Sequence, residues 1–287
     1  MIIIADGGST KTNWCLIDDN QKRINFNTEG YNPYFIDTKS IIKSLQSSLP
    51  ANLALDKITE VDYYGAGVHN EEKASVVEKA LRAVFSNAQL NVGHDLLAAA
   101  RALLGNEAGF AAILGTGTNS CIYDGENITF NIDSLGYFLG DEGSGSSIGK
   151  RLLRDYMRGF MPADLSEIFY NTYKLNTEDI LDNLLNKPLP NRFLASFSKF
   201  IYDNNNFVEY ARDVVKESFT LFFQNLVSRY PDYQQYSFNC IGSVGYNFRD
   251  ILREVSTEYG MSVGKIIRSP IDDLVEYHIK MAGQAQP

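Results

Sequence analysis

The chain begins with short apolar runs that are separated by polar turns, the first of which is rich in glycine. An apolar run at 2–5 leads into a Gly/Ser/Thr turn at 6–10, and strand-like runs follow at 11–17 and 23–28. Glycine allows the tight turn that joins two neighbouring strands. This pattern predicts a β-meander of three strands at the start of the chain.

The same pattern returns further along the chain. An apolar run at 110–114 leads into a Gly/Thr turn at 115–120, and strand-like runs follow at 121–124 and 128–132. A supersecondary unit that occurs twice indicates an internal duplication. Between the two copies, the spacing of apolar residues predicts helices at 39–48, 71–85 and 96–104 and strands at 61–67 and 89–92.

The rest of the chain is mainly helical. Helical spacing dominates from 144 to about 230, and a strand is predicted at 237–242 with a helix running to about 259 after it. A last strand at 263–267 and a final helix at 272–281 complete the pattern. Strands that alternate with helices in this way predict an α/β protein.

Composition and charge exclude some classes of function. Of the 287 residues, 44% are hydrophobic and 21% are charged, which is typical of a globular protein. The formal net charge is −9, and no basic run provides the Lys/Arg footprint that nucleic-acid binding requires. We therefore expect no nucleic-acid partner. A small polar substrate, with any anionic cofactor held by backbone amides, suits this charge better.

The start of the chain and its cysteines bear on the cellular compartment of the protein. The start has neither a basic leader nor a long apolar stretch, and no window approaches the ~18 apolar residues of a membrane span. Cys15, Cys121 and Cys240 lie far apart in strand-like segments, without the Cys-x-x-Cys spacing of a metal site. We expect buried thiols, no membrane partner and a cytoplasmic protein.

The first glycine turn has the chemistry of a phosphate-binding loop. Its glycines let backbone N–H groups approach an anion, its hydroxyls add donors, and its lysine supplies a point charge. These residues are Gly7, Gly8, Ser9, Thr10 and Lys11. Asp6, which precedes them, could hold Mg²⁺ directly or through water. Taken alone, the segment is explained equally well by an ordinary hairpin turn.

A second turn repeats this chemistry, and a third segment extends it. The second turn contains Gly115, Thr116, Gly117 and Thr118. Two such turns in repeated settings favour a nucleotide site, in which a polyphosphate is held from both sides. In the third segment a strand runs through Gly242, Ser243 and Val244 into a helix. The flat base of a nucleotide could lie against the backbone there, because glycine has no side chain. A tight strand-to-helix turn is a strong alternative for that segment.

Other nucleotide motifs do not fit the sequence. A Walker A loop requires Gly-x-x-x-x-Gly-Lys-Ser/Thr, but the stretch from Gly145 to Arg151 has the wrong spacing and no hydroxyl after Lys150. No Gly-x-Gly-x-x-Gly opens a helix after the first strand, so a Rossmann dinucleotide site is not expected.

The three glycine segments resemble the phosphate-1, phosphate-2 and adenosine motifs of the actin, heat-shock-protein and sugar-kinase superfamily. Within it, the chain most resembles the N-acetylglucosamine kinase branch of the family that also contains the ATPase activators of benzoyl-CoA reductase. The resemblance covers about 1–149 and 237–281. The segment at 152–236 resembles the family only in being helical.

The resemblance implies a two-lobed, actin-like (ribonuclease H-like) fold with a duplicated β-meander and helices in each lobe. The N-terminal lobe would comprise 1–106 with a returning helix at 271–287, and the C-terminal lobe 107–270. The cofactors implied are ATP and Mg²⁺. Many kinases of the family are dimers, so a homodimer is compatible with the resemblance, although no segment marks an interface.

The resemblance also assigns a catalytic base. In these kinases an Asp just before an Ala-rich helix lies opposite the γ-phosphate of ATP, and Asp95 matches that position. It would accept the proton of the attacking sugar hydroxyl and would also contact the sugar. On spacing alone, Asp95 is better explained as the N-cap of the helix at 96–104. His94 is expected to be structural.

Further sugar contacts follow from the same resemblance. Asp141, in the Gly-Asp-Glu-Gly-Ser loop at 140–144, would bind sugar hydroxyls through an exposed carboxylate, although a charged helix start also explains this loop. Asn32 matches a sugar-binding Asn, or is a turn residue before proline. Ser134, Leu135 and Gly136 occupy the place of a Gly-Trp-Gly segment, from which Leu135 departs.

The sequence thus predicts an ATP-dependent kinase of an amino sugar, with N-acetylglucosamine converted to its 6-phosphate. Three alternatives stay open: an ATPase activator of a radical dehydratase, a nucleotide-dependent binding or filament protein, and a kinase of a related sugar. Those related sugars are glucosamine, N-acetylmuramic acid and N-acetylmannosamine. The first alternative would hold an iron–sulfur cluster by cysteines from two subunits.

Overall fold

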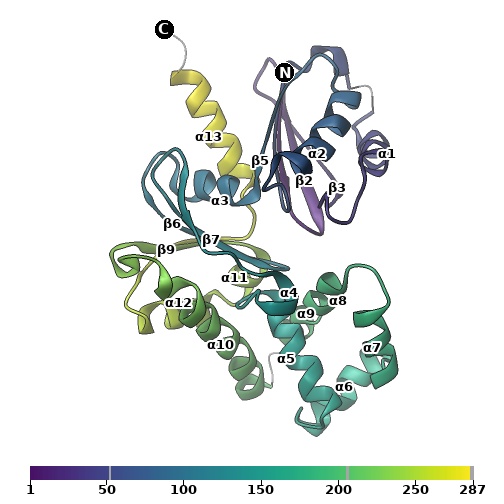
Figure 1. The fold of residues 1–287 in the computed structure, drawn as a ribbon, viewed down its shortest axis with the longest axis vertical. Helices are drawn as coiled ribbons and strands as arrows, with labels where there is room; N and C mark the ends of the chain where they lie inside the picture. Colours follow the sequence, from purple (N-terminus) through teal and green to yellow (C-terminus); the bar gives the residue numbers. More distant parts are fainter. Residues whose placement is uncertain (52, 205–206, 285–287) are drawn as a thin grey trace. The chain divides into compact units, whose positions relative to one another are not determined.

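The computed structural model describes residues 1–51, 53–204 and 207–284 and divides into two compact units (Figure 1). Unit 1 consists of Met1–Glu107, Gly125–Asn127 and Ser269–Pro287. Unit 2 consists of Ala108–Asp124 and Ile128–Arg268. Each unit has its own five-stranded sheet and its own hydrophobic core, so each is described by itself.

The sheet of unit 1 has the strand order β3-β2-β1-β4-β5. The first three strands form an antiparallel meander, while β1, β4 and β5 run parallel. The central strand β1 buries Ile3, Ile4 and Ala5 in succession, as expected for a strand covered on both faces. The strands are β1 (Ile2–Gly7), β2 (Lys11–Ile17), β3 (Arg23–Glu29), β4 (Glu60–Gly65) and β5 (Gln89–His94).

Helices cover this sheet and begin at side-chain caps. Asp37 and Asn70 each accept a hydrogen bond from a backbone N–H of the following helix, at α1 and α2 respectively. The helix α13 returns from the far end of the sequence and buries Leu274 and Val275 in unit 1. The helices are α1 (Thr38–Ser48), α2 (Glu71–Val84), α3 (Asp95–Leu104) and α13 (Ile271–Gln284).

A buried polar network attaches α13 to the sheet of unit 1. His278 Nε2 lies 3.0 Å from the Tyr64 hydroxyl, which also accepts a hydrogen bond from Arg101 at 2.6 Å. His278 Nδ1 lies 3.5 Å from Asp62 Oδ2. Burial, together with the positive charge of Arg101, lowers the pKa of His278 to about 4. The imidazole is therefore neutral at physiological pH.

Unit 2 repeats the topology of unit 1. Its strand order is β10-β9-β6-β7-β8, in which β6, β7 and β8 form the meander and β6, β9 and β10 run parallel. The strands are β6 (Gly109–Leu114), β7 (Thr118–Tyr123), β8 (Ile128–Asn131), β9 (Ser237–Ile241) and β10 (Ser262–Ile267). The predicted α/β fold with a duplicated meander is confirmed.

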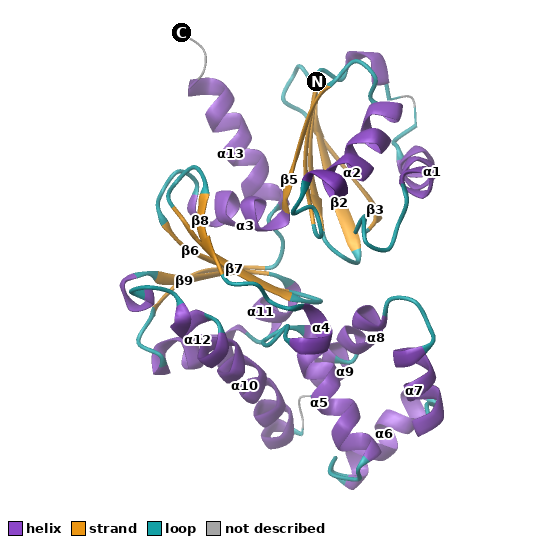
Figure 2. Cartoon of the chain, viewed as in Figure 1, coloured by secondary structure: helices purple, strands orange, loops and turns teal. Residues whose placement is uncertain are grey.

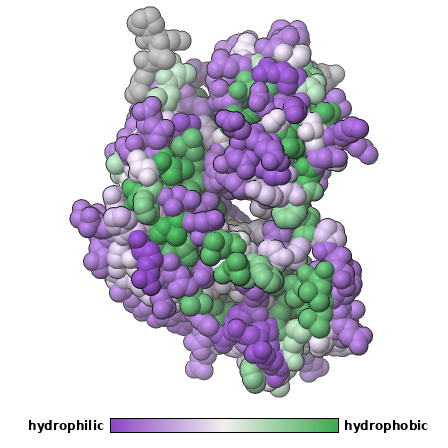
Figure 3. Space-filling view, in the orientation of Figure 1, coloured by the Kyte–Doolittle hydropathy of each residue, from purple (hydrophilic) through white to green (hydrophobic). Residues whose placement is uncertain are grey.

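Most helices of unit 2 belong to the segment that the sequence described only as helical (Figure 2). They are α4 (Gly136–Leu139), α5 (Gly145–Met157), α6 (Ala163–Tyr173), α7 (Thr177–Leu185), α8 (Pro190–Ser196), α9 (Ser198–Asp203), α10 (Val208–Asn225), α11 (Ser243–Asn247) and α12 (Arg249–Glu258). Aromatic side chains such as Phe169 and Phe222 fill the core between them. Hydrophilic residues dominate the face of the molecule drawn in Figure 3.

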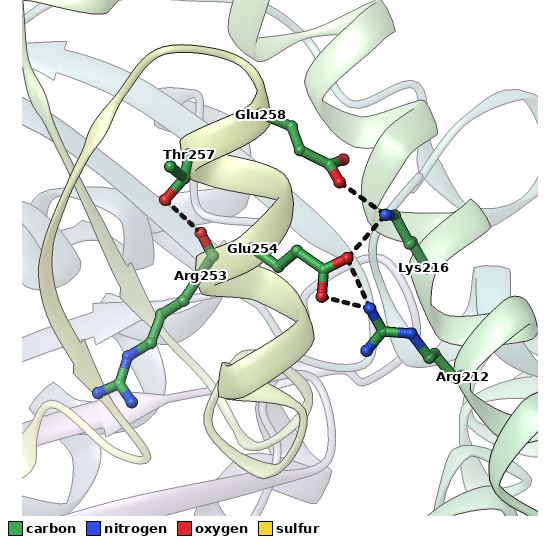
Figure 4. Close-up of polar contacts among 6 residues, drawn as sticks. All are labelled: Arg212, Lys216, Arg253, Glu254, Thr257 and Glu258. Atoms are coloured by element: carbon green, nitrogen blue, oxygen red, sulfur yellow. Dashed lines mark hydrogen bonds and ion pairs between the residues drawn. The ribbon is translucent and has the colours of Figure 1, made fainter.

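An ionic cluster joins α10 to α12 on the surface of unit 2 (Figure 4). Lys216 Nζ lies 2.8 Å from Glu254 and 2.7 Å from Glu258, and Arg212 also pairs with Glu254. These pairs lower the pKa of Glu254. Among the described residues, no helix is long and apolar enough to cross a membrane.

Candidate active site

In unit 1, the candidate residues lie at the carboxyl ends of the three parallel strands. Gly7 of β1 pairs in register with Gly65 of β4, which pairs with His94 of β5. The turn after β1, the loop after β4 and the start of α3 therefore adjoin one another. Ligands of α/β sheets bind at this edge, where the strand ends leave room for loops.

The first glycine turn depends on close backbone packing. Gly8 N–H donates to the Lys11 carbonyl at 2.9 Å, which closes the β1–β2 hairpin. A Cβ at Gly7 would lie 2.9 Å from Cζ of the buried Tyr63, and one at Gly65 would lie 2.5 Å from Cε1 of the same ring. Only glycine fits at these two positions, because Tyr63 lies directly against the backbone of both strands.

Asp6 is a carboxylate with a perturbed pKa at this turn. It is partly exposed, and Asn13 Nδ2 donates to its Oδ2 at 3.4 Å. Burial raises the pKa of Asp6 to about 7, with a smaller contribution from the negative charge of Asp95, while the Asn13 hydrogen bond opposes the rise. Perturbed carboxylates of this kind are typical of functional sites.

Asp95 is the first residue of α3 and is not its N-cap. The cap is His94, whose Nδ1 accepts the Leu96 N–H at 3.0 Å. The interpretation of Asp95 as a cap is therefore wrong, since the preceding imidazole satisfies the free N–H group instead. The Asp95 side chain is 20% exposed, so its carboxylate can reach a ligand. Its Oδ1 lies 3.0 Å from His94 Nδ1.

Asn32 packs against the loop that follows β4. Its Oδ1 accepts the Tyr34 N–H at 3.0 Å, and a Cβ at Gly67 would lie 2.5 Å from the same oxygen. The Tyr34 hydroxyl lies 2.7 Å from His69 Nε2, and the rings of His69 and His94 are 6.1 Å apart. Asn32 is therefore linked to His94, next to Asp95, through a row of aromatic side chains. No sequence pattern identified Tyr34 or His69.

In unit 2, the second glycine turn is held by the start of α5. Gly115 N–H donates to the Gly117 carbonyl at 3.0 Å within the turn. Gly145 N–H donates to the Gly115 carbonyl at 2.8 Å, and the Ser146 hydroxyl donates to the Thr116 carbonyl at 2.7 Å. These hydrogen bonds hold the turn in place through the carbonyl oxygens of its backbone.

Asp141 lies against this turn rather than in solvent. Its Oδ1 accepts the Thr118 N–H at 3.0 Å, and a Cβ at Gly117 would lie 3.0 Å from both carboxylate oxygens. The side chain is 6% exposed, so the exposed carboxylate expected from the sequence is wrong. Burial raises the pKa of Asp141 to about 6, although the bonds from Thr118 and Ser134 oppose the rise.

The segment of Ser134, Leu135 and Gly136 adjoins Asp141 in unit 2. The Asp141 N–H donates to the Ser134 carbonyl at 2.9 Å. Leu135 adopts a left-handed backbone conformation with φ 59° and exposes 59% of its surface. The structure thus brings Ser134 and Asp141 together, with an exposed apolar side chain beside them.

The third glycine segment adjoins the second turn. Ile113 of β6 pairs with Ile241 of β9, so Gly242 follows directly beside the end of β6. Gly242 has φ +127°, and a Cβ there would lie 2.6 Å from the Leu114 carbonyl carbon. Ser243 is exposed and Val244 is buried at the start of the short α11. The second and third segments therefore lie side by side.

The residues present fit a magnesium–nucleotide complex better than an all-protein metal cage. No group of three or more His, Cys, Asp or Glu residues suited to a metal ion occurs among 1–51, 53–204 and 207–284. Mg²⁺ commonly takes one or two carboxylates together with phosphate oxygens and water. Asp6, partly desolvated and close enough to Asp95 to feel its charge, suits that mode of binding.

Comparisons with known proteins agree with this architecture. A "putative N-acetylglucosamine kinase" of Porphyromonas gingivalis has a crystal structure with TM-score 0.91 and 39% identity, covering 98% of this chain and 99% of the other. A "putative N-acetylglucosamine kinase" of Chromobacterium violaceum matches with TM-score 0.72 and 18% identity over 96% and 98% of the two chains. A ROK family glucokinase of Streptomyces griseus, crystallised with glucose and AMPPNP, matches with TM-score 0.57 and 13% identity over 96% and 97%.

The fold and these similarities define an α/β protein of the actin-like ATPase and sugar-kinase class. At 39% identity over nearly the whole of both chains, the chain belongs to the family of the Porphyromonas gingivalis protein, within the actin-like sugar-kinase superfamily. No family model and no curated protein sequence matches the chain.

Proposed function

We propose that this protein is an ATP-dependent kinase that phosphorylates an amino sugar, N-acetylglucosamine, to its 6-phosphate. The single observation that carries the proposal is the position of Asp95. Its partly exposed carboxylate begins α3, at the same sheet edge as the Gly7–Gly8 turn. The 39% identity with the Porphyromonas gingivalis protein supports the sugar class. The proposal also places the chain in the N-acetylglucosamine kinase branch of the family that contains the ATPase activators of benzoyl-CoA reductase.

The proposed nucleotide contacts are described for each unit separately. In unit 2, the backbone N–H groups of the second turn would hold the phosphates, and the surface at Gly242, Ser243 and Val244 would carry the adenine. In unit 1, Gly7, Gly8, Ser9, Thr10 and Lys11 would supply further donors and a positive charge. Mg²⁺, held by Asp6 with phosphate oxygens, would neutralise charge on the transferred group.

Asp95 would act as the general base of the transfer. It would accept the proton of the sugar hydroxyl while that oxygen attacks the γ-phosphorus and ADP leaves. Phosphoryl transfer depends mainly on positioning and electrostatics. The rigid start of α3, fixed by the His94 cap, suits that requirement because it restricts where the carboxylate can point.

The residues proposed for sugar recognition are taken unit by unit. The Oδ1 of Asn32 is occupied by the Tyr34 N–H, whereas its Nδ2 makes no hydrogen bond within the described residues and can donate to a sugar hydroxyl. Asp141 keeps carboxylate capacity beyond its bond with Thr118, and Ser134, Leu135 and Gly136 lie beside it. The exposed Leu135 offers apolar contact in place of a tryptophan.

The rival activator function has no support from the cysteines. Cys15, Cys121 and Cys240 are all buried in strands, and burial raises the pKa of Cys121 to about 12. Thiols in such surroundings are poor metal ligands, because the thiolate is the form that binds. Related amino sugars stay alternatives as substrates. A cytoplasmic location and a homodimer stay predictions.

A coupled ADP-release assay with and without N-acetylglucosamine tests the proposal. Wild-type protein should show sugar-dependent turnover, and Asp95→Asn should lower kcat by about 10²–10⁴-fold, the usual contribution of a general base. Asp56→Asn, an exposed Asp in the same unit, is the matched control and should leave turnover unchanged. Turnover that is independent of sugar and of Asp95 would favour a nucleotide-dependent binding protein. Glucosamine, N-acetylmuramic acid and N-acetylmannosamine in the same assay define the substrate.

A further inference from the structure

A cavity lies in unit 2 between the helices α5, α7 and α8. Its volume is about 370 Å³, which is within the range of pockets that hold small ligands. Figure 1 shows the three helices around this region of unit 2. The residues that line the cavity include none of those proposed above to contact the nucleotide or the sugar. The proposed kinase function therefore gives this cavity no role.

One wall of the cavity carries three positive side chains. Lys150, Arg154 and Arg158 follow one another at four-residue spacing along α5, which brings them to the same side of the helix. In the part of the chain that the structure describes, no acidic residue lines the cavity. The whole chain has 26 Lys and Arg residues against 35 Asp and Glu residues, so this wall is opposite in sign to the protein as a whole. A positive cavity in an acidic protein favours an anionic ligand.

The two arginines of this wall are only weakly neutralised by the protein itself. Arg154 Nε lies 4.0 Å from Asp155 Oδ1, whereas the other oxygen of that carboxylate accepts a hydrogen bond from Arg151 at 2.6 Å. Arg158 is exposed at the end of α5 and makes no ion pair with any other residue that the structure describes. Both guanidinium groups can therefore pair with an anion that enters the cavity.

Lys150 places a partly buried ammonium group at the other end of the row. Its Nζ donates to the Tyr137 carbonyl at 2.6 Å, which uses one of its three N–H donors. Burial lowers the pKa of Lys150, while the negative charges of Asp141 and Glu142 oppose the fall. An anion bound beside Lys150 would stabilise its charged form further.

The remaining walls of the cavity are mainly apolar. Leu153 and Leu194 are each 2% exposed, and Met157 and Leu184 are partly buried against the same core. Thr177 adds a hydroxyl at the start of α7. An inorganic ion gains nothing from apolar walls, whereas an organic group gains by removing its own apolar surface from water. The cavity thus suits a ligand that combines an anionic group with an apolar part.

We infer that this cavity binds a small organic phosphate. The phosphate pairs with the cations of α5, and the apolar part of the ligand lies against the leucines and Met157. A phosphate offers three acceptor oxygens and up to two negative charges, so it can engage a row of three cations more fully than a carboxylate can. This binding site is separate from the proposed kinase function and does not depend on it.

Methyl NMR of the free protein tests the inference, because Met157 lines the cavity and serves as a local probe. In ¹³C-methionine-labelled protein, Met157→Leu identifies the Met157 signal by its loss. We expect phenyl phosphate to shift this signal to saturation and to leave the signal of Met261, buried elsewhere in unit 2, unmoved. Inorganic phosphate and benzyl alcohol each carry one half of the ligand chemistry and should bind at least about 10-fold more weakly.

Substitutions of the arginines give the matched comparison. Arg154→Gln and Arg158→Gln should each weaken phenyl phosphate binding by about 10-fold or more, the usual effect of losing a hydrogen bond to a charged group. Arg253→Gln removes the same charge from α12 and should leave the affinity unchanged. Arg253 (Figure 4) is the control because its side chain and that of Arg154 are both 50% exposed.

Three results would overturn the inference. They are an unmoved Met157 signal at about 10 mM phenyl phosphate, equal affinity in wild type and both arginine variants of α5, and binding of either half-ligand as tight as that of phenyl phosphate. Arg158→Gln keeps the test decisive if Arg154→Gln does not fold, because Arg158 is exposed at the helix end. A normal Met157 response in a protein that phosphorylates no sugar would overturn the kinase proposal alone.

Discussion

Two carboxylates in the candidate site carry raised pKa values, so their ionised forms lower the stability of the folded protein. Burial raises the pKa of Asp6 to about 7 and that of Asp141 to about 6. An acid that the fold holds in its protonated form contributes stability at low pH and loses it as pH rises through the folded-state pKa. Raised pKa values of this kind are typical of functional sites, and the proposed cation at Asp6 and sugar hydroxyl at Asp141 would compensate the ionised forms.

Asp6 gives the clearest pH-dependent prediction. The folded protein binds its proton more tightly than the unfolded chain, so the stabilisation is complete below about pH 4 and lost by about pH 7. Asp6→Asn should therefore raise Tm at pH 8 by about 2–4 °C, corresponding to roughly 1 kcal/mol, and change it little at pH 4. Differential scanning fluorimetry at the two pH values measures this.

The same variant should lose kinase turnover if Asp6 holds Mg²⁺. Asp56→Asn is the control, because its side chain is exposed and should show no pH-dependent gain in Tm. A Tm gain for Asp6→Asn that is equal at pH 4 and pH 8 would show that Asp6 is not desolvated.

Individual side chains were the hardest part of the site to predict. The glycine turn drew attention to Asp6, whereas Asn32 and Asp95 were assigned by family resemblance. In the structure Asp6 and Asp95 lie at one sheet edge of unit 1, and Asn32 packs against the loop that follows β4. The sequence did not predict the burial of Asp141, which depends on a hydrogen bond to Thr118, twenty-three positions earlier. It also gave no sign of Tyr63 under Gly7, because that contact exists only once β1 and β4 are paired.

At the scale of elements, the glycine segments are fixed by backbone geometry. Gly242 has φ +127° and lies against the backbone of Leu114. Gly242→Ala should therefore lower Tm through strain of about 1–3 kcal/mol and weaken binding of a nonhydrolysable ATP analogue. Thermal unfolding and titration calorimetry measure the two effects.

Gly283→Ala is the matched control for this substitution. Gly283 lies exposed in α13, and a Cβ there meets nothing within 4 Å. Alanine is favoured over glycine inside helices, so this variant should be unchanged or slightly more stable. Equal Tm values for both variants would mean that the Gly242 backbone is not strained.

The returning helix α13 can be tested in the same way. Leu274 is fully buried in unit 1, so Leu274→Ala should destabilise the protein by about 2–5 kcal/mol through lost burial and a cavity. Chemical denaturation measures the change. Glu276→Gln, on the same helix, removes only the exposed ion pair with Arg23 and should have little effect. A small effect of Leu274→Ala would show that the burial of α13 does not stabilise unit 1.

Strands were predicted more accurately than helices, for a physical reason. The second strand was predicted at 11–17, and β2 spans Lys11–Ile17, because a glycine turn precedes this run and the polar turn Asp18-Asp19-Asn20 follows it. The helix predicted to end near 259 is divided at Phe248 into α11 and α12. The four-residue α4 was not predicted, since none of its residues is buried and its pattern carries no periodicity.

At the scale of the whole molecule, the chain consists of two units with similar topology and separate cores. Among the described residues, one core cluster draws its members from 1–107 and the other from 108–268. The duplication was predictable because each copy repeats a complete meander with its turns. The helical segment between β8 and β9 was not, since its helices pack by tertiary contacts among aromatic residues such as Phe169 and Phe197.

The most direct test of the account is mass spectrometry of N-acetylglucosamine after incubation with the protein, ATP and Mg²⁺. We expect the sugar to gain one phosphoryl group, ADP to appear in equal amount, and Asp95→Asn to slow the formation of both products by about 10²–10⁴-fold. ADP formed without any phosphorylated sugar, at the same rate in wild type and Asp95→Asn, would contradict the assignment of Asp95 as the base of an amino-sugar kinase.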